Sequence, residues 1–510
     1  MDKSKLTQKD DKKDSQATTK KHFFDKMINI VAIINIILIP IIAFFNTTAT
    51  IVLMIVFILA YIFVSSEYGI NKIEKVKLYL DVRPYLKASK SLNHSASLIV
   101  KYIYNLPLKE NESELDSFSE VQAYIGDKWP FMKKIENTRA SKIRVEGKDC
   151  VCISSYNYLD LGRDERCQIA AVQAANAYSS GNHGPRMLCG NLQILEDLEV
   201  KIAKFFKKDH ALVFSSGFLA CMSTIAGIAR KGDLLLMDKL SHASLRTGAK
   251  ICSAKTAIFK HNDFKDAEKI IKQNKFNRLI MVIEGIYSMD GDIGDLPAAR
   301  KLCDKYNGIL VMDEAHSLGT LGKTGHGAEE HFGYTVFADI ICGTFTKSIS
   351  SVGGFLTCNA RLREYYTFYA PGLVFSAPLS AYHCGAAVKA FEIIEAEPER
   401  AQKVQANGEY LRKRLLEKGF KIGETVTNVI PVIFRDILQV VYMHDFMLKK
   451  GYFAAAVAAP ACALDAPRYR ICATSADTKE SLDNIVKVLV EARDAVPENE
   501  KFKKLMTVLK

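Results

Sequence analysis

The sequence predicts an α/β fold with a mostly parallel central sheet, a smaller C-terminal α+β domain and an N-terminal membrane anchor. Three observations predict this architecture. From Val151 onward, short apolar runs alternate with amphipathic helices, which is the pattern of a parallel sheet covered on both faces. After about Phe391 the helices lengthen, and we expect a second unit to begin there. Residues 27–64 are almost wholly apolar, which is long enough to cross a membrane.

The N-terminal apolar stretch favours one or two membrane spans. Its 38 residues are too many for one upright helix, because a span needs about 20 residues. Two short helices turning at Asn46 would fit, and so would a single tilted or kinked helix through Pro40. Basic residues flank the stretch, with Lys26 before it and Lys72 after it. The positive-inside rule then places both flanks in the cytosol, which favours the hairpin.

Length and composition describe an ordinary folded enzyme. The chain has 510 residues, of which 48% are hydrophobic and 25% are charged, so a disordered or fibrous protein is excluded. No nucleic-acid-binding motif accompanies the net charge of +12, and we expect anionic lipid headgroups and an anionic substrate as partners instead of nucleic acid. The twelve cysteines form no C-x-x-C pair, which predicts buried thiols in a reducing compartment and no metal site.

Six short apolar runs are the expected strands of the central sheet. Strands that are buried on both faces read as continuous apolar runs. One amphipathic helix is also clear, because Asn191 is followed by Leu195, Leu198 and Ile202 with charged residues between them. The expected strands are residues 211–214, 233–237, 279–283, 309–312, 340–342 and 355–358.

An acid, an imidazole and an amine follow two of these strands. Asp313 and His316 come just after residues 309–312, and Lys347 comes after residues 340–342. Taken singly, such an Asp or His is often a helix cap and such a Lys is usually solvated. Together they suit pyridoxal phosphate (PLP), because the acid can pair with a protonated ring nitrogen, the imidazole can bind the ring oxygen and the amine can form a Schiff base.

A second group of residues is suited to the phosphate of such a cofactor. Ser216, Gly217 and Phe218 stand where an expected strand meets a helix. Backbone N–H groups at a helix start, unobstructed at the glycine, can hold a phosphate. Thr344 and Thr346 flank the lysine and offer hydroxyl donors for the same group.

Other side chains could complete the site around the ring and the substrate. His242 follows an expected strand, where it could stack on the pyridine ring and contact a substrate carboxylate, although a capping histidine is the simpler interpretation. Ser288 could reach the cofactor, while Glu284 would organise the same loop. Arg468 and Arg470 carry guanidinium groups suited to a carboxylate, although an Arg on a strand is more often a surface residue.

The chain divides into five expected segments, of which the fourth carries the PLP residues. They are a disordered polar tail (1–22), the hydrophobic membrane anchor (23–66), a helical connector with an N-terminal segment (67–158), a large PLP-binding domain (159–391) and a small C-terminal domain (392–510).

These motifs resemble those of the α-oxoamine synthases, a branch of the fold-type-I PLP-dependent transferases. The resemblance covers about residues 150–490 and implies that His242 stacks on PLP, Asp313 pairs with its nitrogen, His316 contacts its O3′ and Lys347 carries it. The segments that carry the resemblance are residues 156–159, 259–262, 284–290, 313–319, 343–348, 468–472 and 478–480.

The same resemblance implies the surroundings of the cofactor. Asn157 and Arg470, and less surely Arg468, become candidates for binding the substrate carboxylate or the acyl-CoA. A dimer with PLP at its interface is implied, to which the facing chain's Ser376 would contribute a phosphate contact. A homodimer is expected, and a heteromer stays open.

Family members condense an amino acid with an acyl-CoA thioester, so the resemblance implies a PLP-dependent acyltransferase. The anchor favours L-serine and a long-chain acyl-CoA, because a lipid product partitions into the bilayer. We therefore expect an enzyme anchored in the endoplasmic reticulum membrane, with its catalytic domain facing the cytosol. Two alternatives stay open: a relative that uses glycine or alanine, and a non-catalytic subunit of a larger complex. The second is disfavoured because Lys347, His242 and Asp313 are all present.

Overall fold

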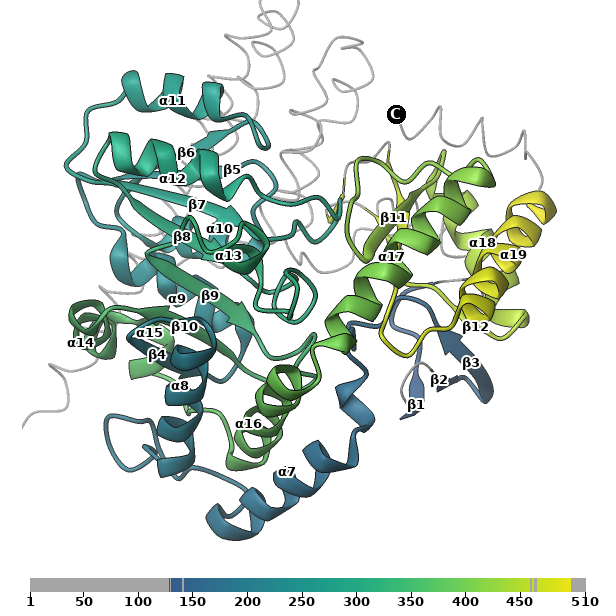
Figure 1. The fold of residues 1–510 in the computed structure, drawn as a ribbon, viewed down its shortest axis with the longest axis horizontal. Coiled ribbons are helices and arrows are strands. Elements are labelled where there is room, and N and C mark those ends of the chain that lie inside the picture. The colour runs from purple at the N-terminus through teal and green to yellow at the C-terminus, as the bar shows by residue number, and fades with distance from the viewer. Residues whose placement is uncertain (1–127, 129, 140–141, 459–460, 463–465, 497–510) are drawn as a thin grey trace, which may run out of the picture. The chain divides into compact units, whose positions relative to one another are not determined.

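The computed structural model describes Lys128 and residues 130–139, 142–458, 461–462 and 466–496 (Figure 1). Three sheets organise this part of the chain. The largest has seven strands in the order β4-β10-β9-β8-β7-β5-β6, and only β10 runs antiparallel to its neighbours. The prediction of a mostly parallel sheet is therefore confirmed. The strands are β4 (His210–Phe214), β5 (Leu234–Asp238), β6 (Lys255–Phe259), β7 (Leu279–Glu284), β8 (Ile309–Asp313), β9 (Ile340–Thr344) and β10 (Gly354–Cys358).

Two layers of helices cover the faces of this large sheet (Figure 1). Successive strand residues point to opposite faces, so in β7 Met281 and Ile283 join one apolar core while Ile280 and Val282 join the other. The first core is closed by α7 (Glu165–Tyr178), α8 (Gln193–Phe205), α11 (Phe264–Lys272), α12 (Leu296–Lys305) and α16 (Ala381–Ala396). The second is closed by α9 (Gly217–Ile228), α10 (Ala243–Ile251), α14 (Ala360–Tyr369) and α15 (Pro371–Val374).

The C-terminal part builds its own core around a three-stranded sheet. Its strands lie in the order β11-β14-β13, and Tyr469 and Ile471 of β14 are fully buried between this sheet and its helices. The elements are α17 (Glu399–Glu417), β11 (Val429–Ile433), α18 (Ile437–Lys449), β13 (Ala456–Val457), β14 (Arg468–Cys472) and α19 (Lys479–Ala495).

A small N-terminal sheet joins this C-terminal part. Its order is β1-β2-β3-β12, and β12 pairs with β3 in parallel. The strands are β1 (Ile135–Arg139), β2 (Lys142–Val145), β3 (Lys148–Cys152) and β12 (Tyr452–Phe453). Two short helices complete the described elements, namely the 3₁₀ helix η2 (Leu161–Arg163) and α13 (Ala328–His331).

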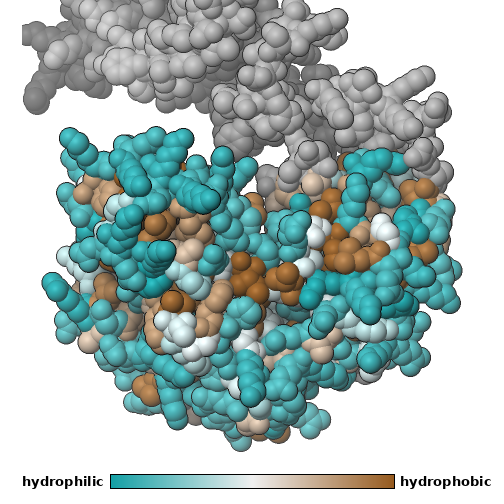
Figure 2. Space-filling view, turned by 45° about the horizontal axis from the view of Figure 1, so that its top comes forward, coloured by the Kyte–Doolittle hydropathy of each residue, from teal (hydrophilic) through white to brown (hydrophobic). Residues whose placement is uncertain are grey.

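The surface of the described residues is mainly hydrophilic on the face drawn in Figure 2, with hydrophobic side chains gathered near its middle. No helix in the described part of the chain is long and apolar enough to cross a membrane. The predicted anchoring in the endoplasmic reticulum membrane, with a cytosolic catalytic domain, is therefore corrected. Residues 23–66, on which it rested, lie outside the described residues, as do the expected polar tail and the connector up to residue 127.

Candidate active site

Three carboxylates lie at the carboxyl ends of adjacent strands of the large sheet. Asp313 ends β8, Glu284 ends β7 and Asp238 ends β5, and Glu284 pairs in register with Asp313. The carboxyl edge of a parallel sheet is where α/β proteins bind their ligands. Lys347 follows β9, the next strand on the other side of β8, so the order of the strands brings the predicted acid and amine to one edge.

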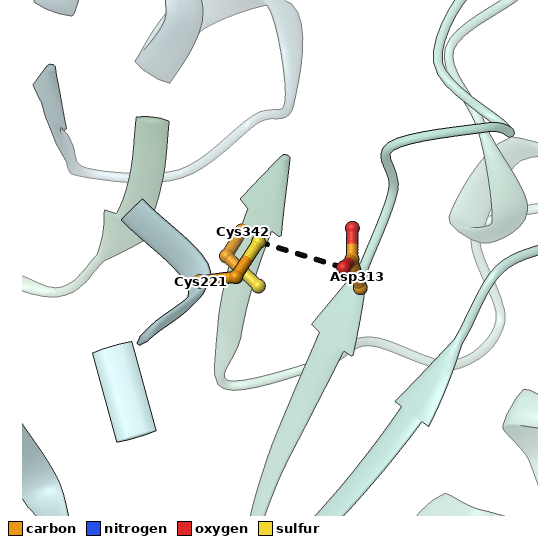
Figure 3. A group of neighbouring side chains, drawn as sticks. All are labelled: Cys221, Asp313 and Cys342. Carbon is orange, nitrogen blue, oxygen red and sulfur yellow. Dashed lines mark hydrogen bonds between the residues drawn. The ribbon is translucent and has the colours of Figure 1, made fainter. Parts of the chain in front are cut away.

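The Asp313 carboxylate is almost wholly buried, with 3% of its surface exposed. Its Oδ1 accepts the backbone N–H of Ala315 at 2.9 Å. Its Oδ2 accepts the thiol of Cys221, with 3.5 Å between sulfur and oxygen. Figure 3 shows Asp313 facing Cys221 and Cys342. The acid is thus oriented by contacts from two elements, as an acid that must pair with a ring nitrogen requires.

His316 lies in the turn after β8 and is also buried. Its Nδ1 is 2.8 Å from the phenolic oxygen of Tyr158. Burial lowers the pKa of His316 well below its usual value, and the nearby Lys347 and His242 lower it further. The imidazole is therefore neutral at physiological pH, and Tyr158 fixes its orientation.

Lys347 is half-buried in the turn after β9. Burial lowers the pKa of its amine, against the opposing charge of Asp313. Its Nζ lies 5.6 Å from the ring centre of Tyr156. A lowered pKa makes the neutral amine more available, and that is the form that attacks an aldehyde.

His242 caps the start of α10, because its Nδ1 accepts the backbone N–H of Ser244 at 3.2 Å. The backbone N–H of His242 in turn donates to Glu284 Oε1 at 2.5 Å. Burial lowers the pKa of His242, although the residue keeps part of its surface exposed. Burial and the neighbouring Asp313 raise the pKa of Glu284 well above its usual value. His242 is thus a capping residue, as the simpler interpretation had it. The Glu284 carboxylate binds the loop before α10, whereas the prediction had it organise the loop that carries Ser288.

The predicted phosphate turn is at the start of α9. Ser216 is the N-cap, and its Oγ accepts the backbone N–H of Leu219 at 3.1 Å. A Cβ on Gly217 would stand only 2.4 Å from the Cβ of Thr344, so the two segments meet where only glycine fits. The hydroxyls of Thr344 and Thr346 lie 2.9 Å apart. Phe218 is half exposed beside them. These residues form one cradle of N–H and O–H donors.

The two candidate arginines of β14 differ in their partners. Arg468 donates to the Asp290 carboxylate and to the Met289 carbonyl, both at 2.9 Å. Arg470 is buried and lies 4.4 Å from the ring centre of Tyr156. It donates to the Ser288 carbonyl at 3.3 Å, and its Nε has no hydrogen-bond partner in the described structure. Burial lowers the pKa of Arg470. A buried cation without a carboxylate partner in the described structure is a candidate for binding one.

The remaining candidates are spread around this edge. Asn157 Oδ1 accepts the hydroxyl of Ser350 at 2.5 Å, and that hydroxyl also donates to the Lys347 carbonyl at 3.1 Å. Asn157 therefore holds the loop that carries the lysine. Ser288 is buried next to Arg470. Ser376 follows α15 and donates only to the adjacent Ala377 carbonyl at 3.3 Å, and its expected role in a facing chain stays a prediction.

Sequence reasoning missed three contributors to the site. Tyr156 lies between Lys347 and Arg470, Tyr158 orients His316, and Cys221 contacts Asp313. Both tyrosines fall in residues 156–159, a segment already singled out by its family pattern, which was the available signal. Nothing in the sequence around Cys221 marked it.

The arrangement fits PLP. It offers a buried carboxylate for the ring nitrogen, a depressed-pKa lysine for the aldehyde, and N–H and hydroxyl donors at Gly217, Thr344 and Thr346 for the phosphate. The unpartnered Nε of Arg470 adds a place for a carboxylate beside them.

Comparisons with known proteins agree with this chemistry. The chain matches the family described as aminotransferase class I and II over residues 148–489. It is 34% identical to a serine palmitoyltransferase of Bacteroides ovatus, over 72% of this chain and 94% of that protein. It is 33% identical to an 8-amino-7-oxononanoate synthase of Alkaliphilus oremlandii, over 69% of this chain and 90% of that protein.

Solved structures of serine palmitoyltransferases share the fold of this chain. A serine palmitoyltransferase from S. paucimobilis, determined with PLP and myriocin bound, superposes with a TM-score of 0.72 at 26% identity, covering 76% of this chain and 99% of that one. The serine palmitoyltransferase of Sphingomonas wittichii gives a TM-score of 0.72 at 27% identity, over 76% of this chain and 98% of that one. The chain therefore belongs to the class I and II aminotransferases, in their α-oxoamine synthase branch, and its cofactor is pyridoxal phosphate.

Proposed function

We propose that this protein is a serine palmitoyltransferase. It would condense L-serine with palmitoyl-CoA to give 3-ketodihydrosphingosine, CO2 and CoA, the first step of sphingolipid biosynthesis. The observation that carries the proposal is the buried Arg470, whose guanidinium lacks an acid partner in the described structure and lies against Tyr156 beside Lys347. This is a place for the carboxylate of an amino acid next to the reactive amine. The relatives named serine palmitoyltransferase support serine as that amino acid.

When bound, PLP supplies an electron sink for the carbanion at the substrate's α-carbon. The amine of Lys347 would carry the cofactor and then move a proton at the α-carbon. Asp313 would hold the proton on the ring nitrogen, and His316 would donate to the ring oxygen. His242 would lie over the ring, and Gly217, Thr344 and Thr346, with Ser216 and Phe218, would hold the phosphate.

Two parts of the chain would contribute to the reaction. The proposed large domain (159–391) carries Lys347, and the proposed small domain (392–510) carries Arg470. We also propose a homodimer, in which the facing chain's Ser376 would reach the phosphate. Asn157 would act through the lysine loop, to which it is hydrogen-bonded by way of Ser350.

A second candidate is a synthase that uses glycine or alanine with a shorter acyl-CoA. Its support is that the chain is 33% identical to 8-amino-7-oxononanoate synthases, almost as similar as it is to the serine palmitoyltransferase of Bacteroides ovatus at 34%. A non-catalytic subunit is disfavoured, because Lys347 lies in the site with a lowered pKa.

The purified protein tests the proposal directly. Incubation with L-serine and palmitoyl-CoA is expected to release CoA and to form 3-ketodihydrosphingosine, which mass spectrometry detects. The Lys347→Ala variant is expected to lose at least about 10³-fold in turnover, because it lacks the amine that would carry the cofactor and move the proton at the α-carbon. A bound cofactor whose visible absorbance is the same in wild type and Lys347→Ala would contradict the catalytic assignment.

A further inference from the structure

Two cysteines that have no role in the proposed reaction, Cys221 and Cys342, lie close to Asp313 in the large sheet. Cys221 comes from α9, Cys342 from the middle of β9 and Asp313 from the end of β8 (Figure 3). All three are buried, and their sulfur and carboxylate oxygen atoms lie within 4.8 Å of one another. Two thiols and one carboxylate at this spacing admit two interpretations, a metal centre or a hydrogen-bonded support for the acid.

The hydrogen bonds of the thiols favour the second interpretation, because the Cys221 thiol donates to Asp313 Oδ2 in the described structure. The hydrogen bond to Cys221 raises the pKa of Cys342 well above its usual value, and burial adds to the shift. The hydrogen bond from Cys342 lowers the pKa of Cys221, but burial and Asp313 outweigh it and the pKa is raised overall. A metal ion needs deprotonated thiolates. Protonated thiols are donors instead, so the hydrogen-bonded support fits better.

The direction of the hydrogen bonds also suits such a support. Asp313 Oδ1 is occupied by the N–H of Ala315, which leaves Oδ2 dependent on Cys221. Without Cys221, Oδ2 of this buried carboxylate would lose the hydrogen bond that the described structure gives it. A thiol is a weak donor, so it fixes the rotation of the carboxylate while withdrawing little of its charge.

We propose that Cys221 is a positioning residue, whose thiol holds Oδ2 of Asp313 and thereby aims the carboxylate at the ring nitrogen of PLP. This inference rests on the proposed role of Asp313. It does not depend on which amino acid or acyl-CoA the enzyme uses, because cofactor binding can be measured without substrates.

The test compares PLP binding to the apo-forms of matched variants by titration of the visible absorbance. Cys221→Ala removes the donor and is expected to weaken PLP binding about 5- to 10-fold, as the loss of a hydrogen bond to a charged group does. Cys221→Ser restores a donor without restoring the volume, and is expected to bind within about 2-fold of wild type. Cys358→Ala, a buried cysteine of β10 in the same core, controls for lost volume and should leave PLP binding unchanged.

A double-mutant cycle with Asp313→Asn shows whether Cys221 acts through the acid. In the Asp313→Asn background, Cys221→Ala is expected to change PLP binding less than about 2-fold. An undiminished effect in that background, or equal losses in the Ser and Ala variants, would overturn the inference. Stoichiometric zinc retained by both thiols in the purified protein would overturn it too. Asp313→Asn that binds PLP like wild type would instead refute the role of Asp313 itself, while leaving the choice of substrate untouched.

Discussion

The phenolic oxygen of Tyr158 lies 2.8 Å from Nδ1 of His316, and both side chains are buried. This hydrogen bond fixes an imidazole that would otherwise rotate within the cofactor site. We predict that Tyr158→Phe weakens PLP binding about 10-fold. In this variant Nδ1 of His316 loses its hydrogen-bond partner, so the imidazole is no longer held in one orientation. Equilibrium titration of the apo-protein with PLP measures the effect.

Tyr366→Phe is the matched control. The Tyr366 hydroxyl donates to the Thr224 carbonyl in the core beneath α14, at 3.0 Å. Both variants should lower the free energy of unfolding by about 1–2 kcal/mol, and only Tyr158→Phe should alter PLP binding. Equal PLP affinities in the two variants would contradict the proposed orientation of His316.

A second prediction rests on the close contact between Gly217 of α9 and Thr344 of β9. A Cβ on Gly217 would stand 2.4 Å from Thr344, so Gly217→Ala must displace the start of the helix at a cost of about 1–3 kcal/mol. We expect this variant to lose most of its PLP affinity. Gly181→Ala is the control, because a Cβ there would meet no atom within 4 Å. Normal PLP binding by Gly217→Ala would exclude this turn as the phosphate site.

The two arginines of β14 are predicted to differ in function. Arg470→Gln should raise the KM for the amino acid about 10- to 100-fold, the usual effect of losing a charged hydrogen bond to a carboxylate. Arg468→Gln should affect the loop at Asp290, which it binds, and leave that KM within about 3-fold. Steady-state kinetics at saturating acyl-CoA separates the two. A larger rise of the KM for the amino acid in Arg468→Gln than in Arg470→Gln would mean that Arg468 binds the substrate carboxylate.

A pH-dependent contribution to stability is expected from His261. Its ring bridges Asp238 and Asp292, at 2.9 and 2.7 Å. Burial alone would lower the pKa of His261, but these two carboxylates raise it to about 10. Because the folded pKa exceeds the usual value of about 6.5, the stabilisation is fully present below pH 6.5 and is lost as the pH rises to 10.

Thermal unfolding measured between pH 6 and pH 10 shows whether the stabilisation by His261 falls as the pH rises. Relative to His261→Gln, the wild type should be more stable by about 2 kcal/mol at pH 6, and this difference should vanish near pH 10. His210→Gln, a histidine that pairs with no acid in the described structure, serves as the control. A difference that grows with pH would mean that His261 is neutral in the folded protein.

The large sheet could be predicted because its strands are buried on both faces. All six predicted runs became strands, each within two residues of the expected bounds. The strand β6 escaped notice because it lies at the edge of the sheet and is mostly exposed. The sequence also did not predict the strands β1, β2 and β3, because charged residues interrupt their apolar residues. The antiparallel direction of β10 depends on tertiary pairing, which no local pattern reveals.

The site was predictable where its chemistry follows a strand end, as at Asp313 and Lys347. Contacts between distant segments were not. Tyr158 and His316 are 158 residues apart, and Cys221 and Asp313 are 92 apart. Such pairs form when the loop that carries Tyr158 and the helix α9 pack against the ends of the strands. The difference between Arg468 and Arg470 likewise appears only once Asp290 is placed beside the first.

The central claim is the choice of substrates, and a matrix of turnover rates tests it most directly. Serine, glycine and alanine are each combined with palmitoyl-CoA and with a short acyl-CoA, and CoA release is measured at equal enzyme concentration. We predict that serine with palmitoyl-CoA gives the highest kcat/KM, by at least about tenfold over every other pair, because each tenfold preference corresponds to only about 1.4 kcal/mol of differential binding. Equal or faster turnover of glycine or alanine with the short acyl-CoA would contradict the assignment and favour an oxononanoate-type synthase.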